Sequence, residues 1–262
     1  MLFVLSPAKS LDYESPLPEA VQGLPLSKPG FVPDSEALIE VLRQQSPAQI
    51  ADLMDLSDKL ASLNVARYEA WRPRFTERNS RPALMAFNGD VYDGLAARSL
   101  DATALQWANE HLAILSGLYG VLRPLDRMQP YRLEMGTALP TDRGHNLYQF
   151  WGDRIALHLN RRLAGHAHPV LVNLASQEYF KSVDLSRLKA RVIECVFEDW
   201  HGGRYKIISF NAKRARGLMA RYAIDQRVQT PQGLLGFDRA GYVHDPQVST
   251  PDRLVFRRKE AA

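Results

Sequence analysis

The apolar residues of this chain form short uninterrupted runs that alternate with stretches of helical periodicity. The segments LFVL, PALMAF and PVLVNL occupy residues 2–5, 82–87 and 169–174. Such runs are typical of strands that are buried on both faces. We therefore predict three buried strands at these positions, each followed by polar residues.

Between these runs, hydrophobic residues recur at intervals of three and four, which predicts amphipathic helices. The predicted helices cover residues 34–45, 47–54, 61–71, 103–115, 151–163 and 213–222. Asp34 stands at the start of the first helix and is a suitable N-cap. Residues 47–72 are therefore expected to form a helix, a tight turn and a second helix.

The last third of the chain has the pattern of further strands, with antiparallel pairing expected in one hairpin. Residues 191–198 and 205–210 flank the sequence HGG at 201–203, which predicts a β-hairpin. Residues 242–244 and 253–256 predict two closing strands.

The order of these elements indicates the fold class. Strands and helices interleave without a regular strand–helix–strand order, so we predict a mixed α/β (α+β) fold with a mixed sheet rather than a doubly wound fold. We expect one domain over residues 1–262, with 137–146 as the only candidate boundary and residues 257–262 as a frayed tail.

Composition narrows the class of protein. The 262 residues are 45% hydrophobic and 24% charged, which is ordinary for a globular protein and excludes a mainly disordered chain. No apolar run approaches the roughly 20 residues that cross a bilayer, and a single cysteine excludes a disulfide framework. We expect a cytoplasmic monomer with no membrane partner.

The net charge of +4 becomes informative because the cations are clustered. No Asp or Glu occurs from Trp200 to Ile224. On the helix predicted at 213–222 the apolar residues share one face, and the cations spread over the other: Lys213, Arg214, Arg216 and Arg221. Such a face is either merely solvated or binds phosphate groups, and the absence of acids favours phosphate binding.

The predicted helix–turn–helix at 47–72 resembles a helix-hairpin-helix, a unit that binds the DNA backbone without reading its sequence. Its candidate phosphate-binding cations are Lys59, Arg67, Arg72 and Arg74. The turn has Ser57, Asp58 and Lys59 in place of the usual glycines, and Asp58 would repel phosphate or cap the second helix. Without further information, the sequence favours an ordinary αα-hairpin.

A segment rich in glycine, proline and charge covers residues 115–136. Its charged residues are Arg123, Asp126, Arg127, Arg132 and Glu134. The arginines outnumber the acids, so the segment could line a cationic cleft; alternatively, its charges pair with one another and fix an irregular loop. The sequence leaves both interpretations open.

Groups capable of acid–base chemistry follow each predicted buried strand. If these strands are parallel neighbours, their carboxyl ends bring four side chains into one pocket: Lys9, Asp90, Glu178 and Lys181. Carboxylates and lysines in a cleft can serve as acid and base, but a buried ion network uses the same residue types. No motif specifies a reaction, so no residue is assigned as catalytic.

Redox and cofactor chemistry have little support in the sequence. Cys195 lies in an apolar run between Glu194 and Glu198, which disfavours the thiolate and indicates a core cysteine rather than a peroxide sensor. His166 and His168 lack a third ligand at metal-binding spacing, and no phosphate-binding glycine motif is present. We predict neither a metal nor a cofactor.

Six ordered segments carry a family resemblance. They are SPAKSLDY at 6–13, FNGDVYDGL at 87–95, LSGLYGVLRPLDRMQPYRLEMG at 115–136, LYQFWGD at 147–153, NLASQEYFKSV at 173–183 and KIISFNAKRARGLM at 206–219. Together they resemble the YaaA family of bacterial peroxide stress resistance proteins over nearly the whole chain. Asn88 departs from the Lys expected before Gly89, which puts in doubt any role that needs a cation there.

The resemblance implies a DNA-binding protein with a positively charged cleft and a helix-hairpin-helix, and it reverses the preference for an ordinary hairpin at 47–72. It also implies peroxide resistance through a low level of unincorporated intracellular iron. The expected partner is double-stranded DNA, bound through its backbone with low sequence specificity. The alternative hypothesis is an enzyme that acts on a nucleotide or nucleic-acid base with Lys9, Asp90, Glu178 and Lys181.

Overall fold

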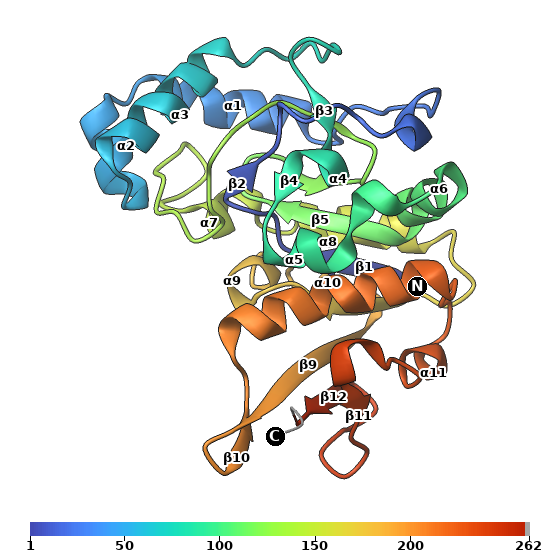
Figure 1. Ribbon diagram of the computed structural model, residues 1–262. Coiled ribbons are helices and arrows are strands. Elements are labelled where there is room, and N and C mark those ends of the chain that lie inside the picture. Colours follow the sequence, from blue (N-terminus) through green and yellow to red (C-terminus); the bar gives the residue numbers. More distant parts are fainter. Residues whose placement is uncertain (260–262) are drawn as a thin grey trace.

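Five parallel strands form the centre of the main sheet, in the order β12-β9-β8-β1-β5 (Figure 1). Short antiparallel strands extend it: β6 pairs with β5, β11 with β12, and β10 with β9. The computed structural model describes residues 1–259. The sheet is mixed and helices interleave with its strands, so the predicted mixed α/β fold is confirmed.

The strands of this sheet are β1 Leu2–Leu5, β5 Leu112–Ser116, β6 Gly120–Leu122, β8 Val170–Leu174, β9 Arg191–His201, β10 Arg204–Lys206, β11 Val243–His244 and β12 Arg253–Arg258. Every residue of β1, β5 and β8 is buried, as expected for apolar strands at the centre of a parallel sheet. Two small antiparallel pairs lie outside the main sheet: β2 Ser10–Leu11 with β4 Phe87–Asn88, and β3 Arg81–Pro82 with β7 Arg127–Met128.

The α-helices are α1 Val32–Arg43, α2 Pro47–Met54, α3 Asp58–Ala70, α4 Ala83–Ala86, α5 Asp90–Leu95, α6 Ala102–His111, α7 Leu147–Trp151, α8 Arg154–Leu163, α9 Gln177–Phe180, α10 Ser209–Asp225 and α11 Pro231–Leu234. One hydrophobic cluster extends through the molecule, from Met1 to Phe256. None of the helices within residues 1–259 has the length and apolar character to cross a membrane.

The helix–turn–helix at 47–72 is present as α2 and α3. A capping box starts α2: Ser46 accepts a hydrogen bond from the Gln49 amide, and the Gln49 side chain accepts one from the Ser46 amide. Asp55 ends the helix in the left-handed conformation, with φ of 50°. Asp58 is the first residue of α3 rather than its cap, and its negative charge there complements the helix dipole.

Two predicted boundaries between helix and strand are wrong. Residues 83–86 of the apolar run at 82–87 form the buried helix α4, because a short apolar run alone does not distinguish a buried helix from a buried strand. The helix predicted at 103–115 ends at His111, and Leu112–Ser116 is the central strand β5.

Three smaller predictions also need correction. Asp34 lies in the first turn of α1, whose N-cap is Phe31, and it pairs with Arg143 at 2.5 Å. The helix predicted at 151–163 is divided at Gly152, which has a φ of 49°, into α7 and α8. The second hairpin strand ends at Lys206 because α10 begins at Ser209.

The chain end predicted to fray is ordered at its first two residues. Arg257 and Arg258 belong to β12 and donate hydrogen bonds to Glu198 at 2.8 Å and Asp199 at 2.7 Å. Residues 260–262 lie outside the described part of the chain.

Helices α5 and α10 cross with their backbones in contact. A Cβ on Gly94 would lie 2.2 Å from the carbonyl oxygen of Arg214, and a Cβ on Gly217 would lie 1.8 Å from that of Val91. Neither position has room for a side chain. Figure 1 shows the long helix α10 running across the front of the strands beside α5. This close crossing fixes the start of α10 beside the carboxyl ends of the central strands.

Candidate functional site

A cavity of about 420 Å³ lies where the carboxyl ends of the central strands meet α5, α9 and α10. Its lining comes from five separate segments: Ser6, Pro7, Ala8, Lys9 and Ser10; Asn88, Gly89, Asp90, Val91 and Tyr92; Tyr131, Arg132, Leu133 and Glu134; Ser176, Glu178 and Tyr179; and Lys213 with Arg216. Ligands of open α/β sheets usually bind at this edge.

Two serines at neighbouring strand ends form the polar floor of the cavity. Strands β1 and β8 pair in register, with Leu5 opposite Leu174, so Ser6 and Ser176 follow adjacent strands. The Ser176 amide donates to Ser6 Oγ at 2.8 Å, and Ser6 Oγ donates to Ser176 Oγ at 3.3 Å. The Tyr92 hydroxyl donates to the Ser6 carbonyl at 3.1 Å. The loop after β1 is therefore held against the start of α9.

One wall of the cavity is an ion cluster in which two cations share a carboxylate. Lys9 Nζ lies 2.9 Å from Glu134, and the Arg132 guanidinium lies 3.0 Å from the other oxygen of the same carboxylate. The Lys9 side chain is 65% exposed, so the pair faces open solvent and contributes little to stability. Lys9 can exchange this partner for a ligand at small cost.

The opposite wall carries two cations from α10 that have no such partner. Within residues 1–259, neither Lys213 nor Arg216 forms an ion pair within 4.0 Å. Arg216 is half-buried, and this burial lowers the pKa of its guanidinium, while the negative charge of Glu194 acts in the opposite direction. A partly desolvated cation without a partner binds an anion more strongly than a fully hydrated one.

Two acids of the lining are likewise free of cations. Glu178 Oε1 accepts a hydrogen bond from the Gly136 amide at 2.9 Å, which fixes its orientation. Asp90 is the first residue of α5. Neither carboxylate forms an ion pair among the residues that the structure describes. The cavity therefore presents unpaired positive and negative groups together.

Buried tyrosines complete the lining. Burial raises the pKa of Tyr92, Tyr131 and Tyr179, so their hydroxyls are neutral and can donate hydrogen bonds. The hydroxyl of Tyr131 also shares a 2.6 Å hydrogen bond with Ser116 at the end of β5. Flat, neutral rings next to charged groups suit a ligand with both an apolar face and ionised substituents.

Three of the four residues proposed from the sequence for acid–base chemistry meet in this cavity: Lys9, Asp90 and Glu178. Lys181 does not line it. Its ammonium lies 4.9 Å from the ring centre of Tyr148 instead, and the residue is the C-cap of α9. Asn88 also lines the cavity and pairs with Ser10 across β2 and β4.

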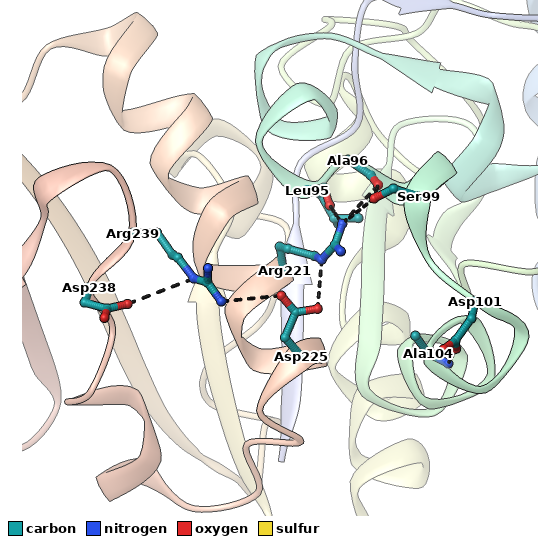
Figure 2. Close-up of polar contacts among 9 residues, drawn as sticks. All are labelled: Leu95, Ala96, Ser99, Asp101, Ala104, Arg221, Asp225, Asp238 and Arg239. Atoms are coloured by element: carbon teal, nitrogen blue, oxygen red, sulfur yellow. Dashed lines mark hydrogen bonds and ion pairs between the residues drawn. The ribbon is translucent and has the colours of Figure 1, made fainter.

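The cations predicted to bind DNA are divided among several places. Arg132, Lys213 and Arg216 line the cavity, and Arg214 is exposed on the same turn of α10. Arg221 has an internal role, shown in Figure 2. Its guanidinium donates to Ser99 Oγ at 2.6 Å, to Asp225 at 2.8 Å and to carbonyl oxygens at the end of α5.

The three arginines of the segment at 115–136 make different contacts. Arg127 lies 3.6 Å from Glu77, away from the cavity. The Arg123 amide donates to Asp126 at 2.8 Å, and Asp126 also accepts from Ser27 at 2.6 Å. Arg132 both pairs with an acid and lines the cavity. Pairing within the segment is therefore seen at the Arg123 amide and at Arg132, and lining of the cavity at Arg132.

The four cations predicted in the hairpin lie on α3 or just after it: Lys59 and Arg67 on the helix, Arg72 and Arg74 after its end. Lys59 and Arg74 are exposed. Arg72 donates to the Trp71 carbonyl at 2.7 Å, and Arg67 donates to Asn64 at 3.2 Å. Burial lowers the pKa of Arg67, and the positive charge of Arg132 contributes to the same shift.

The single cysteine and the histidines occupy positions outside the cavity. Cys195 is buried, and burial raises the pKa of its thiol well above the usual value. No group of three or more His, Cys, Asp or Glu within residues 1–259 is arranged to hold a metal ion. His166 instead faces the amino terminus, 3.1 Å from its nitrogen.

Three features of the lining were not expected from the sequence: the Ser6–Ser176 contact, the role of Glu134 as shared carboxylate, and the hydrogen bond between Tyr131 and Ser116. The position of Ser176 after an apolar strand was a usable signal. The others depend on contacts between segments distant in sequence, which no local pattern contains.

Comparison with known proteins identifies the family. The family model described as "Peroxide stress protein YaaA" matches residues 1–248. The chain belongs to this family. A UPF0246 protein of Paracidovorax citrulli is 70% identical over 261 residues, and one of Delftia acidovorans is 66% identical over 263 residues; both matches cover 100% of each chain. A UPF0246 protein of Bordetella pertussis is 60% identical over 261 residues, again with full coverage. Membership supports a general role in peroxide stress.

Proposed function

We propose that this protein acts in peroxide stress as a cytoplasmic DNA-binding protein that contacts the phosphate backbone. The observation that carries the proposal is the part of the cavity lining that belongs to α10. There Lys213 and Arg216 lie near the carboxyl ends of the central strands without carboxylate partners. Phosphate contacts by such cations release counterions and give affinity that does not depend on base sequence.

The hairpin α2–α3 supplies the second part of the proposed surface. Lys59 and Arg74 are exposed there, and Arg67 lies close enough to Arg132 to sense its charge. A duplex contacting both the hairpin and α10 would pass over the cavity mouth. This arrangement supports double-stranded DNA as the partner.

The proposal is tested by the salt dependence of binding to a blunt duplex. Each of Lys213→Ala and Arg216→Ala should weaken binding and reduce the slope of log affinity against log salt by about 1. Lys189→Ala is the matched control, because Lys189 is exposed and precedes β9 at the opposite edge of the sheet. Duplex affinity that is absent, or insensitive to salt and to both variants, would refute the proposal.

The family resemblance adds a cellular effect: the protein keeps unincorporated iron low and so limits hydroxyl radical formation. The corresponding experiment measures chelatable iron by electron paramagnetic resonance in peroxide-treated cells with and without the gene. Higher iron in the cells without the gene is expected. Equal iron levels would remove this part of the proposal and leave DNA binding untouched.

A second candidate function is an enzyme acting on a nucleotide or nucleic-acid base. It is favoured by the convergence of Lys9, Asp90 and Glu178 on one cavity of about 420 Å³. Glu178→Gln should then abolish peroxide protection while duplex affinity is retained, whereas Lys181→Ala, outside the cavity, should have no effect. Full protection by the Glu178→Gln protein would exclude this function.

A further inference from the structure

Phe210 is the exposed aromatic residue nearest to the cavity along α10. Its side chain belongs to the first turn of the helix, and the residue is 61% exposed. Single exposed apolar residues are common and carry no meaning alone. Phe210, however, is three residues before Lys213, and side chains three apart lie next to each other on a helix surface. The ring therefore stands beside the cation-bearing wall of the cavity.

The sequence around Phe210 contains cations and no acids. No Asp or Glu occurs from Trp200 to Ile224, and Lys213 and Arg216 follow Phe210 at successive intervals of three. Neither cation has an ion-pair partner within residues 1–259. An exposed ring followed by two unpaired cations on one side of a helix combines a stacking surface with a phosphate site.

We propose that the mouth of the cavity binds one nucleotide unit whose base is unpaired, with the base stacked on Phe210 and its phosphate bound by Lys213 and Arg216. This inference rests on the proposed DNA-binding function and adds a site that reads the unpaired state. The nucleotide unit is either part of a DNA strand or a free nucleoside monophosphate.

The shape and polarity of the cavity favour a nucleotide over an acidic peptide or a membrane. A volume of about 420 Å³ is in the range of small-ligand sites. Asp90 and Glu178 line the same space and can accept hydrogen bonds from sugar hydroxyls and exocyclic amino groups, donors that the side chains of an acidic peptide lack. A membrane surface presents phosphates but no free flat base that could stack on Phe210.

The binding experiment compares oligothymidylate, a blunt duplex of equal length and thymidine 5′-monophosphate. Phe210→Ala should weaken binding of oligothymidylate about tenfold and leave duplex affinity unchanged, because duplex bases are already stacked on one another. Phe210→Tyr should retain wild-type affinity for all three ligands. Leu185→Ala is the matched control, since Leu185 is 59% exposed and lies outside the cavity.

The outcomes separate this inference from the proposed function. Duplex binding by the wild type without binding of oligothymidylate or the monophosphate would overturn the nucleotide site and leave the DNA function standing. Binding of the monophosphate without duplex binding would support the site, if Phe210→Ala weakens it, and refute the DNA function. An equal loss on single strand and duplex in Phe210→Ala would overturn the stacking role. Unchanged thermal unfolding of Phe210→Ala verifies that the fold is intact.

Discussion

Gly217 of α10 packs directly against Val91 of α5. The carbonyl oxygen of Val91 lies only 1.8 Å from the position that a Cβ on Gly217 would occupy. Gly217→Ala should therefore separate the two helices and lower the free energy of unfolding by about 3 kcal/mol or more. Urea denaturation measures this change. Gly165→Ala serves as the control, because its Cβ would meet no heavy atom within 4 Å, and it should leave stability nearly unchanged. Equal stabilities of the two variants would contradict this packing.

Arg221 is expected to stabilise the fold rather than to bind DNA. Its guanidinium bonds Ser99, Asp225 and the carbonyl end of α5 (Figure 2). Arg221→Ala should cost about 1–2 kcal/mol of unfolding free energy and leave the duplex affinity of the folded protein unchanged. Arg214 is exposed on the same helix, so Arg214→Ala should weaken duplex binding and leave the free energy of unfolding nearly unchanged. Loss of duplex affinity at full stability in Arg221→Ala would disprove the assignment.

Cys195 is expected to be inert toward oxidants in the native protein. Burial raises the pKa of its thiol, so the reactive thiolate is scarce and shielded. A coloured disulfide reagent should react with Cys195 only after unfolding in urea. Rapid reaction of the native thiol, or its oxidation by hydrogen peroxide at the rate of free cysteine, would show that the site opens.

His158 makes stability depend on pH below neutrality. Burial lowers its pKa to about 4, with the charges of Arg162, Arg161 and Arg123 adding to the effect. In the unfolded chain the imidazole binds a proton near pH 6.5, so protonation favours unfolding. The contribution of neutral His158 to the free energy of unfolding is complete above pH 6.5 and is lost as the pH falls from 6.5 toward 4. Unfolding of wild type and His158→Gln as a function of pH measures it; parallel curves over this window would contradict the prediction.

The prediction that Asp90 lies near Lys9 and Glu178 is correct, although the segment before Asp90 has a different conformation from the one predicted. The apolar run at 82–87 is mostly helix α4, not a buried strand of the main sheet. Asp90 nevertheless reaches the cavity, because β4 pairs with β2 and sets Asn88 opposite Ser10. A local pattern locates the end of a buried segment well even where it does not reveal the segment's conformation.

The helical periodicity of the sequence does not predict which arginine of α10 lines the cavity and which one stabilises the fold. The helical pattern separates a buried face from a polar one, but it does not state which neighbour covers the polar face. Arg216 faces the cavity, whereas Arg221, five residues later, bonds the end of α5. The difference arises from the glycine contacts that bring α5 against α10, and those contacts depend on tertiary structure alone.

The cavity draws its walls from segments that extend from Ser6 to Arg216, so most of the chain must be folded before the site exists. No proteolytic fragment or excised hairpin can carry the complete binding surface. Ligand affinity is consequently a measure of the fraction of fully native molecules, and a destabilising substitution far from the cavity will imitate a functional defect. Transfer of this site to another scaffold would require transfer of the whole sheet.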